Sequence, residues 1–180
     1  MSAFGEYNPP SFYNFRPFFT IQPVQATREK QLNLWKELIV GYHVFHKTFR
    51  MVDPPSFPLF KNNTIGRQLS PSAIKTVIEH IIHEGVAQWE DPSNPVNLLV
   101  MSKSTATIAH ELYTWANKQN LLGFVVTVYE LHSGDEYTDS PVMGMDLVVL
   151  RKALEVLETS GKAIFIAGAN VDEDGVKFMA

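Results

Sequence analysis

The same order of predicted elements occurs twice in this chain of 180 residues, and this repeat limits the possible fold more than any other feature. In each half we predict a long helix, a short helix, a helix with an apolar stripe, a glycine and strand-like runs. This is the order of a winged helix, which is a helix-turn-helix followed by a two-stranded wing. We therefore predict an α+β fold of two tandem winged-helix domains, residues 24–102 and 103–180.

The clearest single element is a helix over residues 71–84. Ser70 is a good N-cap, Pro71 suits the first helical position, and Gly85 suits the position just past the end. The apolar residues between them recur at helical spacing, at Ile74, Val77, Ile78, Ile81 and Ile82. This stripe predicts one buried face.

The remaining elements follow from periodicity and turn residues. In the first half they are a helix over about 27–50, a short helix over 65–69, and strands over 86–89 and 96–101. In the second half they are a helix opening at Ser104 or Thr105, a strand over 124–127, a short helix over 128–131, a helix from Asp146 to Gly161, and strands over 163–166 and 176–178. We interpret residues 172–175 as the hairpin turn, with Gly175 at positive φ.

The first 23 residues are rich in proline and contain seven of the chain's 21 Phe, Tyr and Trp residues, from Phe4 to Phe19. Proline at this density opposes helix and central strand, so we predict an extended segment. Solvated tails lack such apolar groups. Residues 1–23 are therefore either a peptide that docks into a groove of a partner or an arm folded over its own domain.

Charge argues against the nucleic-acid binding that winged helices often perform. The net charge of the chain is −4. The helices over 71–84 and 146–160 each carry a net charge of −1, and three acidic residues fall at the tip of the second wing. Such elements repel phosphate. The first helix has a basic excess, which we interpret as a solvated face. A winged-helix nucleic-acid-binding protein remains the alternative prediction.

No residue pattern predicts catalysis, a metal or a cofactor. Cysteine is absent, which removes disulfides and thiolate ligands. Two His-x-x-His pairs and an acidic cluster are the candidate metal ligands: His43 with His46, His80 with His83, and Asp135, Glu136 and Asp139. Each lacks a full ligand set, so surface or partly packed side chains are the simpler interpretation. The chain lacks a signal peptide and a membrane span, which makes a soluble protein of the cytosol or nucleus the expectation.

Five blocks of sequence resemble a known family over nearly the whole chain. They are residues 16–23 (Arg-Pro-Phe-Phe-Thr-Ile-Gln-Pro), 27–32, 58–63, 126–136 and 175–178. The chain is similar to the family of vacuolar protein sorting-associated protein 25, the subunits of the endosomal ESCRT-II complex. The resemblance implies tandem winged helices and a non-catalytic adaptor. It also implies that two copies of the chain join one copy each of two other core subunits.

The resemblance further implies docking through N-terminal Pro-Pro-x-Tyr-like motifs into an apolar pocket on a core subunit. The corresponding residues are Pro9, Pro10 and Phe12, and Pro17, Phe18 and Phe19. Phe12 and Phe19 stand where tyrosine is common, which keeps the ring and removes the hydroxyl. A ligand for a WW-type domain is a second rival, and the missing tyrosine argues against it.

The resemblance implies that the second winged helix contacts the ESCRT-III subunit that starts filament assembly, through residues that the sequence does not assign. The assembly then sorts ubiquitinated membrane cargo into multivesicular bodies. The protein is expected in the cytoplasm, with recruitment to endosomal membranes through the complex and no direct contact with nucleic acid.

Overall fold

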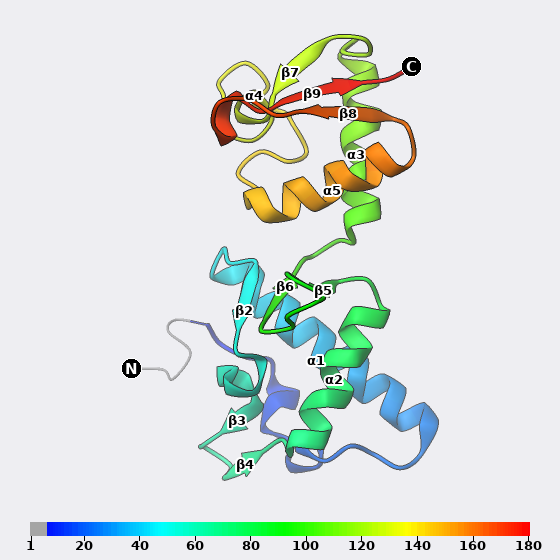
Figure 1. Ribbon diagram of the computed structural model, residues 1–180. Coiled ribbons are helices and arrows are strands. Elements are labelled where there is room, and N and C mark those ends of the chain that lie inside the picture. Colours follow the sequence, from blue (N-terminus) through cyan, green and yellow to red (C-terminus); the bar gives the residue numbers. More distant parts are fainter. Residues whose placement is uncertain (1–6) are drawn as a thin grey trace. The chain divides into compact units, whose positions relative to one another are not determined.

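The computed structural model describes residues 7–180, which form two compact units, and the chain passes from one to the other between Ser102 and Lys103 (Figure 1). Both units combine helices with a small antiparallel sheet, as predicted for the α+β class. Residues 1–6, with Phe4 of the predicted docking segment, lie outside the described residues. Within residues 7–180, no helix has the length and apolarity needed to cross a membrane.

The first unit contains two helices, a three-stranded sheet and a short hairpin. These elements are α1 (Gln25–Phe45), β2 (Arg50–Val52), β3 (Lys61–Asn62), β4 (Arg67–Gln68), α2 (Pro71–His83), β5 (Ala87–Trp89) and β6 (Asn97–Val100). Four 3-10 helices complete it: η1 (Ser11–Asn14), η2 (Arg16–Phe19), η3 (Pro54–Ser56) and η4 (Pro58–Phe60). The sheet order is β2-β6-β5, and α1, α2 and the sheet bury one common core around Trp35, Ile81 and Leu98.

The start and end of α2 follow the predicted signals. The Ser70 side chain accepts a hydrogen bond from the Ala73 backbone N–H at 3.1 Å, and Gly85 has a φ of 73° just after the helix. Four of the five predicted stripe residues are buried and Ile82 is partly buried. Local capping and periodicity are therefore sufficient to define this helix.

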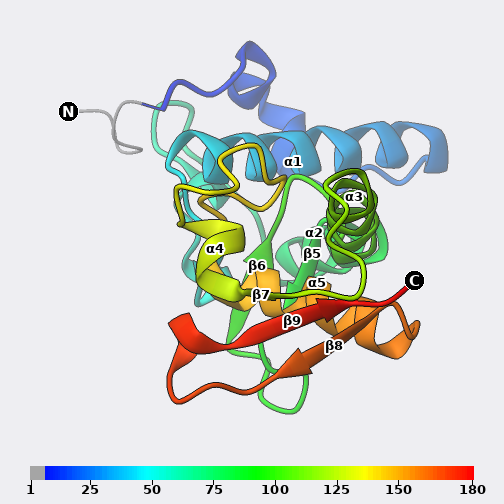
Figure 2. The same ribbon diagram turned by 90° about the horizontal axis from the view of Figure 1, so that it is seen from above.

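The second unit contains three helices and a three-stranded sheet. Its elements are α3 (Thr105–Lys118), β7 (Val125–Thr127), α4 (Val128–His132), α5 (Leu147–Thr159), β8 (Ala163–Ile166), η5 (Val171–Glu173) and β9 (Gly175–Phe178). The sheet order is β7-β9-β8, with both pairs antiparallel. Figure 2 shows η5 beside α4, where the Val128 backbone N–H donates to the Asp174 carbonyl oxygen at 2.7 Å.

The prediction of an extended N-terminal segment is wrong for about half of the segment described. Residues 11–14 and 16–19 are 3-10 turns, closed by hydrogen bonds such as that from the Tyr13 backbone N–H to the Pro10 carbonyl oxygen at 3.0 Å. Proline tolerates this geometry because its fixed φ and missing N–H suit the first residues of a short helix. Residues 7–23, here termed the N-terminal arm, pack within the first unit.

Two further predictions are also wrong, a short helix over residues 65–69 and a hairpin turn over residues 172–175. Residues 65–69 form a turn and strand β4 instead of a short helix, because their backbone pairs with β3. Gly175 is the first residue of β9 and pairs with Ile166 and Thr127, so the turn lies before it, where residues 171–173 form η5. In both cases pairing with a distant strand decides the local conformation.

Candidate protein-docking site

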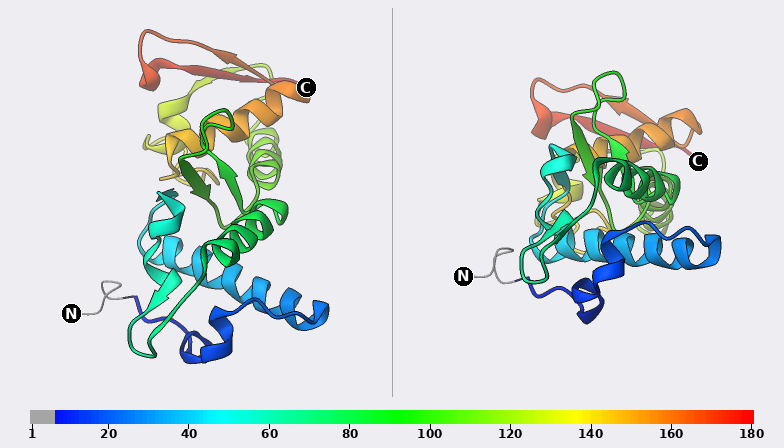
Figure 3. Two further views of the ribbon diagram at one scale, coloured as in Figure 1. Left: turned by 60° about the horizontal axis from the view of Figure 1, so that its bottom comes forward. Right: turned by 90° about the horizontal axis from the view of Figure 1, so that it is seen from below.

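The N-terminal arm runs antiparallel along α1. The Tyr7 ring packs edge-on against Tyr42 near the end of α1, with ring centroids 5.4 Å apart, whereas Phe18 contacts Trp35 in its middle. Figure 3 shows this dark blue segment passing along α1 before the chain enters it. Over the residues described, the arm therefore folds over its own domain.

Two phenylalanine side chains of the arm belong to the core of the first unit. Phe18 stacks on Trp35 with centroids 4.3 Å apart and an interplanar angle of 11°, and Phe19 meets the same indole edge-on at 5.5 Å. Phe18 and Phe19 are 4% and 3% exposed. Burial of a phenylalanine side chain contributes about 1.5–3 kcal/mol to folding, so these rings hold the arm in place.

Polar side chains of α1 fix the arm backbone. Gln31 is buried, and its amide nitrogen donates to the carbonyl oxygens of Phe18 and Thr20 at 2.9 and 2.8 Å. Its amide oxygen accepts from the Gln22 backbone N–H at 3.0 Å. Trp35 Nε1 donates to the Phe18 carbonyl oxygen at 3.2 Å. These bonds supply partners that a short 3-10 segment cannot provide for itself.

The other side of the arm is hydrogen-bonded to η4 and β3. The Tyr13 hydroxyl donates toward the carbonyl oxygens of Leu59 and Lys61, each at 3.0 Å, and burial raises the pKa of Tyr13. Asn62 Nδ2 in turn donates to the Tyr13 carbonyl oxygen at 3.0 Å. The arm is thus held from both α1 and β3.

Residues 14–17, here termed the arm tip, are all exposed between the buried anchors Tyr13 and Phe18. Phe15 is 63% exposed, an unusual position for a large apolar ring. Phe15 is not among the docking residues predicted from the sequence. Its exposure depends on where two 3-10 turns meet, and no sequence period reports this.

The six predicted docking residues differ in exposure. Pro10 and Pro17 are exposed, Pro9 and Phe12 are partly buried, and Phe18 and Phe19 are buried. The Phe12 ring packs edge-on against Phe18 with centroids 5.2 Å apart. Four of the six side chains are therefore accessible together with Phe15, whereas Phe18 and Phe19 serve as anchors.

The motif Pro-Pro-Ser-Phe, with a second Phe three residues later, occurs twice, at residues 9–15 and 54–60. In the second copy Phe57 and Phe60 are 6% and 2% exposed and pack against each other at 5.2 Å. The same short motif thus exposes its final ring in one place and buries it in the other. Motif sequence alone does not mark a docking residue here.

His43 and His80 are packed or hydrogen-bonded side chains, whereas the His83 side chain is 86% exposed. His43 is 4% exposed, stacks on Phe57 at 5.6 Å, and its Nδ1 lies 3.0 Å from Thr48 Oγ1. His80 Nε2 lies 3.2 Å from Asn33 Oδ1. Over residues 7–180, no three His, Asp or Glu side chains come together as a metal site would require.

Lowering the pH from 7 to 5 is expected to destabilise the first unit by up to about 2 kcal/mol through His43. Burial lowers the pKa of His43 from 6.5 to about 4 in the folded protein. Protons therefore favour the unfolded chain between these values, so stability falls as the pH drops below 6.5. Urea unfolding at both pH values should show a weaker pH dependence for His43→Gln. An identical dependence in the two proteins would contradict the assignment.

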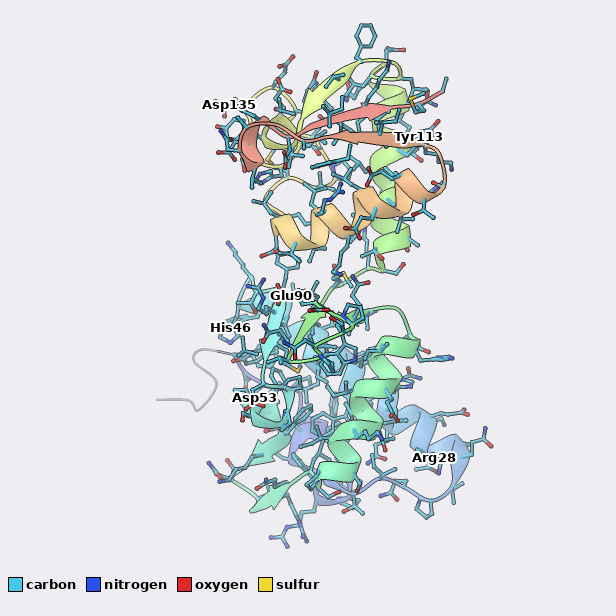
Figure 4. The ribbon with its side chains drawn as sticks, in the orientation of Figure 1. Arg28, His46, Asp53, Glu90, Tyr113 and Asp135 are labelled. Carbon is cyan, nitrogen blue, oxygen red and sulfur yellow. The ribbon has the colours of Figure 1, made fainter. Side chains whose placement is uncertain are left out.

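The basic excess of the first helix is largely engaged within the protein. Lys36 pairs with Glu84 at 3.0 Å, Arg50 pairs with Glu90, and Arg28 donates to the Pro23 carbonyl oxygen at 3.2 Å. Arg28 and Glu90, the partner of Arg50, lie apart in Figure 4, so Arg28 and Arg50 do not share one basic patch. The arrangement offers little to a phosphate backbone.

The second unit exposes an apolar sheet face. Val125, Ile164 and Ile166 are 55%, 49% and 43% exposed, and the register places them on one face with Lys177 and Gly175. A Cβ on Gly175 would meet Val125 Cγ1 at 3.0 Å, so the flanking side chains close over this glycine. We term Val125, Ile164, Ile166 and Lys177 the outer sheet face.

Comparisons of the sequence with known proteins agree on one family. The sequence model described as the ESCRT-II complex subunit matches residues 12–146. Vacuolar protein sorting-associated protein 25 of Arabidopsis thaliana is 37% identical over 185 residues, which cover 99% of each chain. The Xenopus laevis protein of that name is 36% identical, over 94% of this chain and 97% of its own length.

Solved structures have the same fold. Subunit VPS25 of the endosomal trafficking complex ESCRT-II aligns with a TM-score of 0.76 at 24% identity, over 99% of this chain and all of that one. A chain of the ESCRT-II endosomal trafficking complex aligns with a TM-score of 0.73 at 26% identity, covering 94% and 98%. A third similar structure, at a TM-score of 0.72 and 24% identity, is the endosomal complex ESCRT-II (VPS22/VPS25/VPS36), with coverage of 99% and 100%.

Proposed function

This chain belongs to the ESCRT-II complex subunit family that includes vacuolar protein sorting-associated protein 25, and from that premise we propose that it is a non-catalytic adaptor of endosomal sorting. The observation that carries the proposal is the anchored arm with an exposed aromatic tip. A rigid apolar ring on the surface loses little conformational freedom on binding, which favours a docking role. The partners are homologues of VPS22 and VPS36, the subunits named in a similar structure.

In this proposal two copies of the chain dock on one core of the other two subunits. Phe15 and Phe12 enter an apolar pocket of the core, with Pro9, Pro10 and Pro17 packing beside them. Phe18 and Phe19 support the tip from within the first unit, because they are already buried there. Docking then requires no unfolding of the arm.

The second unit provides the link to the ESCRT-III subunit that starts filament assembly. Its outer sheet face supports this part of the proposal, since exposed Val and Ile side chains on one face are typical of protein contacts. Through this link the complex would sort ubiquitinated membrane cargo into multivesicular bodies. The chain itself would reach endosomal membranes only as part of the complex.

Mass determination of the mixed subunits tests the proposal. We expect a complex that contains two copies of this chain and one copy of each VPS22 and VPS36 homologue. Adding the initiating ESCRT-III subunit should give a larger assembly, and Ile164→Asp should weaken that step at least about tenfold while the core assembly remains. Thr159→Asp, an exposed change on α5 of the same charge, is the matched control.

Two results would contradict the proposal at different points. A chain that stays alone with the core subunits at micromolar concentration would contradict core docking. Equal ESCRT-III binding by Ile164→Asp and Thr159→Asp would remove the outer sheet face from the proposed link.

A further inference from the structure

Ser133 is an exposed serine in the position directly after α4. Its Oγ lies 2.6 Å from Nδ1 of its chain neighbour His132, and within residues 7–180 the hydroxyl has no hydrogen bond to any other residue. Ser133 is also the first residue of a loop, residues 133–146, that contains no helix or strand. The hydroxyl therefore holds no other element in place and is open to modification.

Two carboxylates follow Ser133 in this loop. Asp135 and Glu136 are exposed, and neither belongs to an ion pair found within residues 7–180. Figure 4 shows Asp135 on the outside of the second unit. Among all serines and threonines of the chain, only Ser133 has carboxylates at both the second and the third following positions. This combination of an exposed hydroxyl and following negative charge sets Ser133 apart.

We propose that Ser133 is phosphorylated by a protein kinase that selects acidic sites. Kinases recognise their substrates partly through complementary charge, so the basic side chains of such a kinase would bind Asp135 and Glu136. In the transfer, Ser133 Oγ forms a bond to the γ-phosphorus of ATP while the bond from that phosphorus to the ADP oxygen breaks. The hydroxyl proton passes to a carboxylate of the kinase. This modification is independent of the proposed core docking.

Other serines and threonines of the chain offer poorer acceptors. Ser70 and Ser140 each precede a proline, the pattern of proline-directed kinases, but Ser140 is 6% exposed and Ser70 Oγ caps α2. Thr76 and Thr127 each have a glutamate at the third following position. In both, the hydroxyl is hydrogen-bonded to the helix that contains this glutamate. Phosphorylation at these positions would break helical capping or burial, whereas at Ser133 it breaks only the contact with its neighbour.

A phosphate on Ser133 is expected to loosen the end of α4. The backbone N–H groups of Ser133 and Gly134 both donate to the Tyr129 carbonyl oxygen, each at 2.8 Å. A phosphoserine carries a charge of about −1.5 to −2 at pH 7. Here it would lie at the negative end of the helix and next in sequence to Asp135 and Glu136, which repel it. Hydrogen exchange at the two amides should therefore be faster in the phosphorylated chain.

The test incubates the folded, full-length chain with casein kinase 2, which selects acidic sites, and Mg²⁺–ATP. Mass spectrometry should locate phosphate on Ser133 and find none in Ser133→Ala. Asp135→Asn with Glu136→Gln should lower the initial rate of phosphorylation at least about tenfold. Asp172→Asn with Glu173→Gln removes the same charge from a second exposed acidic pair, on η5, and should stay within about twofold of the wild type. Circular dichroism of each variant verifies folding.

Hydrogen exchange of the phosphorylated and unmodified chains completes the test. We expect exchange at the Ser133 and Gly134 amides to be at least about threefold faster with the phosphate, and unchanged exchange would overturn the predicted effect on α4. Equal rates of phosphorylation in the two double variants would overturn the acidic selection. Phosphate on Ser70 or Ser140 instead, or on Ser133 only after unfolding in urea, would overturn Ser133 as the site. None of these results alters the expectation for core docking.

Discussion

Trp35→Ala is expected to destabilise the first unit by about 3–5 kcal/mol, the range measured for truncation of large buried aromatic side chains. Trp35 is fully buried, and its ring contacts Phe18, Phe19 and Phe60 with centroids 4.3–5.7 Å apart. Its Nε1 also donates to the Phe18 carbonyl oxygen. Removing the indole leaves a cavity between α1 and the arm and removes one of the hydrogen bonds that the Phe18 carbonyl oxygen accepts. Urea unfolding followed by far-UV circular dichroism measures the loss.

Trp35→Phe and Phe45→Ala are the matched controls for this prediction. The first keeps an aromatic ring in the core and should cost less than Trp35→Ala. The second truncates an aromatic ring that is 49% exposed, also on α1, and should cost about 1 kcal/mol or less. If Trp35→Ala is no more destabilising than Phe45→Ala, the arm does not depend on the indole.

Phe12→Ala with Phe15→Ala is expected to weaken binding to the VPS22–VPS36 core at least about 100-fold, because central aromatic residues of an interface each contribute about 2 kcal/mol or more. The loss of stability should be small, since Phe15 is 63% exposed and Phe12 is only partly buried. Isothermal titration calorimetry measures the affinity, and thermal unfolding measures the stability. Affinity and stability are thus separable in this variant.

Phe124→Ala and Phe18→Ala complete the comparison. Phe124 lies in the second unit and is 65% exposed, so its truncation matches Phe15→Ala in exposure and should leave core binding unchanged. Phe18→Ala should lower stability by about 3–5 kcal/mol because its ring is buried on Trp35. Core binding that persists in the Phe12 and Phe15 double variant but fails in a folded Phe18 variant would mean that the arm unpacks on docking.

The sequence predicted best those elements whose signals are local. Ser70, Ser104 and Asp146 each accept a hydrogen bond from the first turn of the helix that follows, as N-caps do. Gly161 has a φ of 70° after α5. These capping signals depend on a few neighbouring residues, so a single sequence is enough to identify them.

The sequence predicted less well those elements that depend on distant partners. The β3–β4 hairpin includes residues that were predicted to form a helix. Its first strand is hydrogen-bonded to Tyr13 of the arm, almost 50 residues earlier in the chain. The arm itself turns because Gln31 and Trp35 of α1 supply hydrogen-bond partners for its backbone. No local pattern encodes these contacts.

The sequence by itself determined the α+β class, most of the helices and the presence of an aromatic, proline-rich segment at the N-terminus. Only the tertiary structure decided which aromatic rings of that segment are anchors and which one is exposed. The physical reason is that Phe12, Phe15, Phe18 and Phe19 are chemically equivalent, so the choice among them is made by the space and hydrogen bonds that α1 and the β3–β4 hairpin offer.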